Sequence, residues 1–150
     1  MLEEFVKQFT NKSVEFFKIE NSYFLKDDDL EKHLLSKEPT LFGVYLGKEV
    51  NKKFVPSFNL LDLIALSSNE KVFVTDFGEL DFLYGKHLRK RHVTSIQGSL
   101  QMGTKKLVQN TFDENIGYGI YLGEQHNSTK ILTHVLDRGV FIKRDKKLKK

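Results

Sequence analysis

The sequence contains no cysteine among its 150 residues. This absence excludes disulfide bonds, thiolate metal sites and cysteine nucleophiles, and it fits a protein that works in a reducing compartment. Tryptophan is absent too, whereas phenylalanine occurs 13 times, so we expect cores built on Phe, Leu, Val and Ile. Hydrophobic residues make up 39% of the chain, enough for a packed core and against general disorder.

Long apolar runs are also missing. The segment Met1–Phe5 is acidic where a secretory signal would be basic, and no apolar segment follows it. The most apolar stretch, Phe58–Leu66, is too short to cross a bilayer and carries Asn59 and Asp62. We therefore expect no signal peptide and no membrane partner. The expected location is the cytoplasm, or the nucleus or nucleolus in a eukaryote.

The motifs of common enzyme classes do not occur. The sequence has no GxxxxGK[ST] loop, and Gly103–Lys106 is only a basic turn. Gly117-Tyr118-Gly119 lies inside a strand pattern and does not open a helix, so it is no dinucleotide-binding motif. Neither GxSxG nor HExxH is present, and the five histidines show no helical metal-ligand spacing. We predict that the protein is not an enzyme and that it has no metal site and no cofactor.

Charge is distributed unevenly along the chain. The formal net charge is +4, but residues 1–70 carry −3 and residues 71–150 carry +7. Such polarity indicates a half that binds a polyanion attached to a half with another task. The run Ser67–Asn69, where the charge changes sign, is the expected boundary between a domain at residues 1–69 and a domain at residues 70–150.

The first domain has the pattern of an α+β fold with an antiparallel sheet. We expect a short helix at 2–8, a hairpin of strands at 14–19 and 23–25, a strand at 41–46, a polar turn at 47–53, and a helix that Ser57 caps and that runs to about Leu66. Asp27, Asp28 and Asp29 precede a leucine-rich segment and indicate a helix N-terminus. Catalytic carboxylates are the alternative interpretation of that acidic run.

The second domain has the pattern of a small closed β-barrel with one helical insertion. A helical turn at 80–83 ends at Gly85, the residue type expected in the left-handed position after a helix. His134 alternates with apolar neighbours and is expected inside the barrel. Strands are predicted at 71–75, 92–97, 107–111, 117–123, 131–136 and 139–143.

Two groups of basic residues lie in this second domain. Clustered Lys and Arg side chains bind phosphates with little dependence on sequence, and Arg also stacks on unpaired bases. His87 and His92 flank the first group and are expected on the same polyanion-binding surface. The alternative is that these basic groups bind nothing and form a solvated face and a solubilising tail. The candidate RNA-binding residues are Lys86, Arg89, Lys90, Arg91, Arg138, Lys143, Arg144, Lys146 and Lys147.

Several segments resemble the Nip-seven family of ribosome biogenesis factors, which carry a C-terminal PUA domain. The run Asp81–Leu88 is similar to the family's F-L-Y-G-x-H segment, and Gly117–Gly123 is similar to its G-[FY]-G strand. Asp137–Phe141 looks like its D-x-G-x-[YF] closing turn, and Leu61–Ala65 is similar to the end of its N-terminal domain. The resemblance runs from about Thr40 to Ile142, and the lysine-rich tail looks more like that of an archaeal member.

The resemblance implies an assembly factor of the large ribosomal subunit. Such a factor binds precursor rRNA through a PUA-type β-barrel, and binds other assembly proteins through its N-terminal domain. We also expect U-rich single strands among the RNA ligands. By position, the basic residues near the family's closing strand correspond to Arg138, Lys143 and Arg144, followed by Lys146 and Lys147. The cluster from Lys86 to Arg91 is assigned from charge and location instead.

Two other functions are compatible with these residues. The chain is alternatively an RNA-targeting module of an RNA-modifying enzyme, which turnover or cofactor binding by the isolated chain would reveal. The third possibility is a protein-interaction scaffold with an incidental basic surface. In that case its affinity for RNA would be no better than its affinity for heparin.

Overall fold

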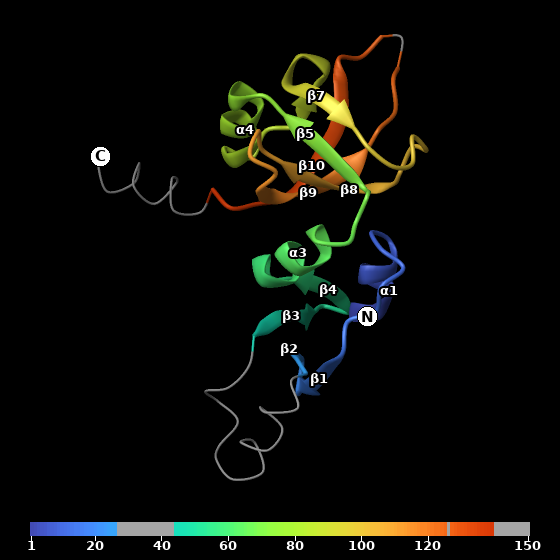
Figure 1. The fold of residues 1–150 in the computed structure, drawn as a ribbon, viewed down its shortest axis with the longest axis vertical. Coiled ribbons are helices and arrows are strands. Elements are labelled where there is room, and N and C mark those ends of the chain that lie inside the picture. Colours follow the sequence, from blue (N-terminus) through green and yellow to red (C-terminus); the bar gives the residue numbers. More distant parts are fainter. Residues whose placement is uncertain (27–43, 126, 140–150) are drawn as a thin grey trace, which may run out of the picture. The chain divides into compact units, whose positions relative to one another are not determined.

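The computed structural model describes residues 1–26, 44–125 and 127–139 (Figure 1). The chain divides between Ser67 and Ser68 into two compact units. An antiparallel sheet occupies the first unit and a curled sheet occupies the second, which confirms the predicted α+β class. The acidic helix N-terminus expected at Asp27–Asp29 and the strand expected at 139–143 lie wholly or mostly outside the described residues.

The N-terminal unit (Met1–Ser67) is built on a sheet of four antiparallel strands in the order β1-β2-β3-β4. Its elements are α1 (Leu2–Lys7), β1 (Phe16–Ile19), β2 (Ser22–Leu25), β3 (Tyr45–Val50), β4 (Lys53–Pro56) and α3 (Phe58–Ala65). The predicted first helix, the first hairpin and the Ser57-capped helix are all present. The Ser57 hydroxyl accepts a hydrogen bond from the Leu60 backbone at 3.2 Å, which satisfies one of the free N–H groups at the start of α3.

Aromatic rings form much of the core of this unit. Phe54 of β4 lies 5.4 Å from the ring of Phe5 and 5.5 Å from that of Tyr23, measured between ring centroids. Leu60 and Ile64, one turn apart on α3, are buried on the side that faces the sheet. The composition therefore predicted the kind of core correctly, because phenylalanine rings pack here in tilted and edge-to-face pairs.

The polar turn predicted at 47–53 is wrong. Strand β3 continues through Gly47 to Val50, and a turn of two residues, Asn51 and Lys52, leads directly into β4. Both turn residues have positive φ, 50° and 62°, as a tight hairpin with right-handed strand twist requires. Lysine is unusual in that conformation, so no local signal in the sequence predicted this hairpin.

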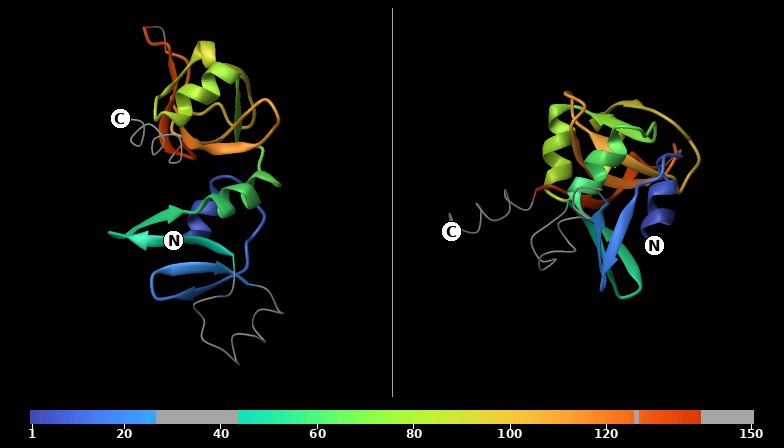
Figure 2. Two further views of the ribbon diagram at one scale, coloured as in Figure 1. Left: turned by 90° about the vertical axis from the view of Figure 1, so that its left-hand side faces the viewer. Right: turned by 60° about the horizontal axis from the view of Figure 1, so that its bottom comes forward.

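The C-terminal unit (Ser68–Lys150) contains a sheet of six strands in the order β6-β10-β9-β8-β5-β7. Its elements are β5 (Lys71–Val74), α4 (Asp76–Leu83), β6 (Leu88–Arg89), the 3-10 turn η2 (Lys90–His92), β7 (Val93–Ile96), β8 (Lys105–Gln109), β9 (Asn115–Tyr121) and β10 (Lys130–Asp137). Among the strands that the structure describes, β5 and β8 alone pair in parallel. The two outermost strands, β6 and β7, are consecutive in the chain and joined by η2, so the sheet curls into a nearly closed barrel (Figure 2).

Helix α4 packs on this barrel and is longer than the predicted turn at 80–83. It begins after Thr75, whose hydroxyl accepts from the Gly78 backbone at 3.0 Å, and it buries Phe82 completely. Gly85 follows the helix with φ 86°. The Lys86 N–H donates to the Asp81 carbonyl at 3.1 Å and the Gly85 N–H donates to the Phe82 carbonyl at 2.9 Å. This pair of bonds is a Schellman motif, and it confirms the predicted role of Gly85.

Candidate nucleic-acid interface

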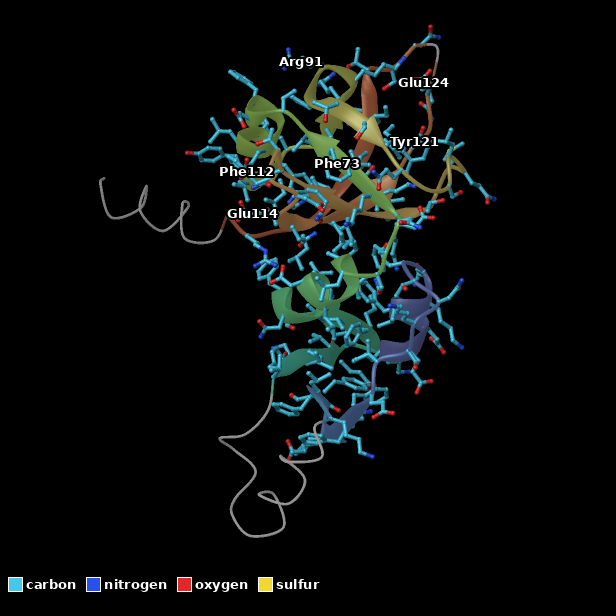
Figure 3. The ribbon with its side chains drawn as sticks, viewed as in Figure 1. Phe73, Arg91, Phe112, Glu114, Tyr121 and Glu124 are labelled. Carbon is cyan, nitrogen blue, oxygen red and sulfur yellow. The ribbon has the colours of Figure 1, made fainter. Side chains whose placement is uncertain are left out.

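Three of the predicted cations lie together at the closure of the barrel. We call Arg89, Lys90 and Arg91 the seam turn, because they join the two outermost strands of the sheet. With Thr129 they line a hollow of about 560 Å³. Within the described part of the chain, neither Lys90 nor Arg91 is paired with a carboxylate. Figure 3 shows Arg91 at the upper edge of this unit.

Strand β10 fixes the seam turn in place. Arg89 pairs with Lys130 in the β6–β10 ladder, and the Lys90 N–H donates to the Thr129 carbonyl at 2.9 Å. The Arg89 guanidinium also donates to the Thr129 hydroxyl at 2.5 Å. Thr129 and Lys130 are therefore part of this site, although the sequence did not indicate them. They lie 40 residues away from their partners, so only the strand pairing places them here.

His92 supports the seam turn from beneath and is not part of the basic surface. Its side chain is buried, which contradicts the prediction that it faces a polyanion. Its Nδ1 accepts the Arg89 N–H at 3.0 Å, so the ring proton lies on Nε2. That nitrogen is 3.0 Å from Asp81 Oδ2, without the alignment of a good hydrogen bond. A Cβ added to Gly78 would lie 2.7 Å from the His92 carbonyl, so glycine permits α4 to approach this turn.

His87 is exposed, as predicted, but it is also part of the barrel's hydrogen bonding. Its Nδ1 accepts the His134 N–H at 3.0 Å. Partial burial, followed by the positive charge of Lys130 and the proximity of His134 and Arg89, lowers the pKa of His87 from its ordinary value of 6.5. The imidazole is therefore mainly neutral at pH 7, and it becomes a cation only when the solution is acidified or when an anion offsets its neighbours.

The remaining predicted cations do not join the seam turn. Lys86 is exposed, and its Nζ lies 3.5 Å from Asp81 Oδ1. Arg138 follows the far end of β10, which separates it from Lys130 by roughly 25 Å of strand. The side-chain Nε of Arg138 is buried, and the backbone N–H of Arg138 donates to the Ile116 carbonyl at 3.1 Å. Four further predicted site residues lie outside the described residues: Lys143, Arg144, Lys146 and Lys147.

The prediction for Lys106 is also wrong. The segment Gly103–Lys106 was predicted to be a basic turn, yet Lys106 belongs to β8 and is fully buried. Its ammonium lies 2.5 Å from Glu70 Oε2 and also donates to the Gln97 carbonyl. A buried ammonium needs such partners. Lys106 therefore contributes nothing to the basic surface.

Two of the segments that resemble the Nip-seven family, one with Phe82 and the other with Asp137 and Gly139, meet beside His134 in the barrel. The Phe82 ring lies 4.8 Å from the His134 ring, and His134 Nε2 is 2.6 Å from Asp137 Oδ2. The other oxygen of Asp137 accepts the Gly139 N–H at 2.6 Å. A Cβ on Gly139 would come within 1.8 Å of the Leu83 carbonyl. These motif residues therefore join α4 to the end of β10, and His134 is a satisfied barrel residue as predicted.

The described residues form neither a cluster of metal ligands nor a membrane-spanning helix. They contain no group of three or more side chains that could hold a metal ion. Their helices are all too short, or too polar, to cross a membrane.

The curled six-stranded sheet with a helix after its first strand is the fold of a PUA-type domain. Residues 70–146 match the UPF0113 PUA domain, and the chain therefore belongs to that family.

A curated relative and two solved structures add to this assignment. Over 79 residues the chain is 32% identical to the 60S ribosome subunit biogenesis protein nip7 of Schizosaccharomyces pombe, a match that covers 52% of this chain and 44% of that protein. A conserved PUA domain protein from Thermoplasma acidophilum is 16% identical, with 96% of this chain and 91% of that chain covered and a TM-score of 0.59. A PUA domain from Aeropyrum pernix K1, in complex with tartrate, is 13% identical, with coverages of 94% and 82% and a TM-score of 0.60. At such identities these structures show the shared fold.

Proposed function

We propose that this protein binds RNA through the seam turn and acts as an assembly factor on precursor rRNA of the large ribosomal subunit. One observation carries the RNA-binding part. Arg89, Lys90 and Arg91 surround a single hollow, and the last two have no carboxylate partner among the described residues. Cations held at a fixed spacing and not neutralised internally suit a phosphate backbone.

The ribosomal part of the proposal is supported by the matched relative, whose name places it in biogenesis of the 60S subunit. We propose a second group of contacts near the end of β10, from Arg138, Lys143 and Arg144 with Lys146 and Lys147. Because β10 separates Arg138 from the seam turn, the two groups would hold different stretches of one RNA. U-rich single strands are the first ligand to test, since their bases are free to stack on arginine.

We also propose a division of tasks between the two units. The acidic N-terminal unit would bind other assembly proteins, because its net charge of −3 over residues 1–70 opposes contact with RNA. The protein would act in the cytoplasm, or in the nucleus or nucleolus of a eukaryote, as a binding factor without catalysis of its own.

Crosslinking the full-length protein to RNA in its own cells, followed by sequencing, tests this function. We expect fragments of large-subunit rRNA or its precursor, crosslinked at residues of the seam turn or near Arg138. A matched variant with Arg89→Glu and Arg91→Glu should lose most of the crosslinked rRNA while folding normally. Recovery of tRNA alone would favour an RNA-targeting module of a modifying enzyme, and recovery of no RNA would contradict the proposal.

A further inference from the structure

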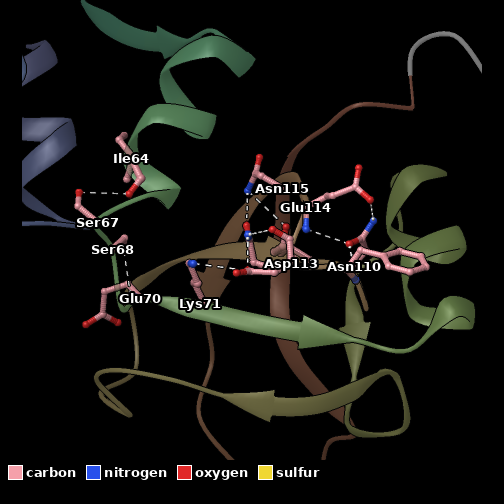
Figure 4. Close-up of polar contacts among 12 residues, drawn as sticks. Ile64, Ser67, Ser68, Glu70, Lys71, Asn110, Asp113, Glu114 and Asn115 are labelled. Carbon is pink, nitrogen blue, oxygen red and sulfur yellow. Dashed lines mark hydrogen bonds and ion pairs between the residues drawn. The ribbon is translucent and has the colours of Figure 1, made fainter.

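The turn between β8 and β9 displays an almost fully exposed phenylalanine. Phe112 is 81% exposed, yet the turn that carries it is rigidly hydrogen-bonded. The side-chain oxygen of Asn110 accepts from the N–H groups of Phe112 and Glu114, each at 2.9 Å. The Asn110 N–H donates to the Glu114 carbonyl at 2.9 Å, as drawn in Figure 4. Because the backbone that carries the ring is already ordered, little backbone freedom is lost when a partner covers Phe112.

The same turn is fastened to helix α4. The Asn110 amide donates to Glu79 Oε1 at 3.3 Å, and the Thr111 hydroxyl lies 3.5 Å from Asp76 Oδ1. Helix α4 exposes two apolar side chains of its own, Phe77 at 70% and Leu80 at 47%. We call Phe77, Leu80 and Phe112 the Phe112 face. Exposed large apolar side chains that lie together on the surface of a soluble domain mark an interaction site.

Acidic residues surround this face. Asp76, Glu79 and Glu114 border it, and no Lys or Arg occurs in segments 76–84 or 110–114. The two segments that form this face therefore carry only negative charge, although residues 71–150 carry +7 overall. Such a rim repels RNA, and it also disfavours the chain's own acidic N-terminal unit as an occupant.

We propose that the Phe112 face binds a basic, apolar segment of a partner protein, in which Lys or Arg residues flank aliphatic or aromatic side chains. The apolar face would bury the partner's apolar residues, and the acidic rim would pair with its cations. The seam turn follows the opposite end of α4, and Figure 3 shows Arg91 apart from Phe112 and Glu114. A partner on the Phe112 face and an RNA on the seam turn can therefore be bound at the same time. This inference goes beyond RNA binding and does not depend on it.

A synthetic amphipathic peptide of leucine and lysine tests the proposal, with a matched leucine and glutamate peptide as its control. Calorimetry on the full chain should show binding of the lysine peptide and at least about a hundredfold weaker binding of the glutamate peptide. Phe112→Ala and Phe77→Ala should each weaken the lysine peptide by about tenfold. Leu100→Ala, which truncates another exposed apolar residue (67% exposed) in a different loop, should leave its affinity unchanged.

Three results would overturn the proposal. Equal effects of Phe112→Ala and Leu100→Ala would mean that the peptide binds without a defined site. A dimer in sedimentation that Phe112→Ala dissociates would identify a second copy of this chain as the occupant. Loss of affinity for a U-rich oligonucleotide in Phe112→Ala, or displacement of the peptide by that oligonucleotide, would assign the face to RNA. The variants are expected to melt at the wild-type temperature, because the truncated rings are exposed.

Discussion

The two ends of helix α4 lead to opposite kinds of surface, although the helix has only eight residues. Its first turn, with Asp76 and Glu79, borders the acidic and apolar Phe112 face. Its last turn is followed by Gly85, and the cations of the seam turn come a few residues later in the chain. The net charge of +7 over residues 71–150 describes neither surface. Recognition by a small domain therefore depends on where a short element separates charges, and not on their sum.

Charge reversal in the seam turn should have the largest effect on RNA affinity. Arg89→Glu with Arg91→Glu should weaken binding to a U-rich oligonucleotide by roughly a hundredfold, since each change removes an attraction to phosphate and adds a repulsion. The dependence of log K on log salt should become shallower by about 1.4, at about 0.7 per phosphate contact. Fluorescence anisotropy over a salt series measures both quantities.

The matched control reverses charge beside the Phe112 face. Asp76→Lys with Glu114→Lys should leave RNA affinity unchanged or raise it slightly. If this acidic pair and the seam arginines changed affinity by the same factor with opposite sign, the RNA would be sensing overall charge, and the seam turn would not be a defined site.

The junction between the two surfaces is expected to depend on Gly85. Gly85→Val should lower the free energy of unfolding by about 1–3 kcal/mol, because a β-branched residue is strained at the observed φ of 86°. Lys86→Val, at the next position, should cost much less. Urea unfolding of both variants measures the difference. Equal stability of the two variants would contradict the requirement for a left-handed residue after α4.

A smaller effect should appear in the pH dependence of RNA binding. The lowered pKa of His87 means that the folded protein binds fewer protons than the unfolded chain, so stability decreases as pH falls below the ordinary value of 6.5. Phosphates near Arg89 and Lys130 would raise that pKa again, and binding would take up a proton. RNA affinity should then rise by less than about tenfold between about pH 7.5 and about pH 5.5.

His87→Gln is the variant that isolates this contribution. Anisotropy titrations across the pH range should show a flatter dependence in His87→Gln than in the wild type. An unchanged pH profile would mean that no phosphate approaches His87, and the RNA would then lie on the Arg91 side of the seam turn.

Sequence alone located the local features of this protein. Ser57 and Gly85 mark helix ends through their own backbone chemistry, so their roles were evident from neighbours within a few residues. The charge difference between the halves required only counting. The hairpin at Asn51-Lys52 escaped prediction because lysine seldom adopts positive φ, so a local signal was absent.

Tertiary structure decided which side chains share a surface. His92 and Lys106 are of residue types common on protein surfaces, yet the folded barrel buries both, and Asp81 and Glu70 lie beside them. Thr129 joins Arg89 across 40 residues, and Phe112 becomes part of one face with Phe77 through bonds from its turn to α4. Whether each such side chain is buried or exposed, and which surface it joins, depends on partners that are distant in the chain. No local pattern encodes those partners, because they are brought together only when the sheet closes.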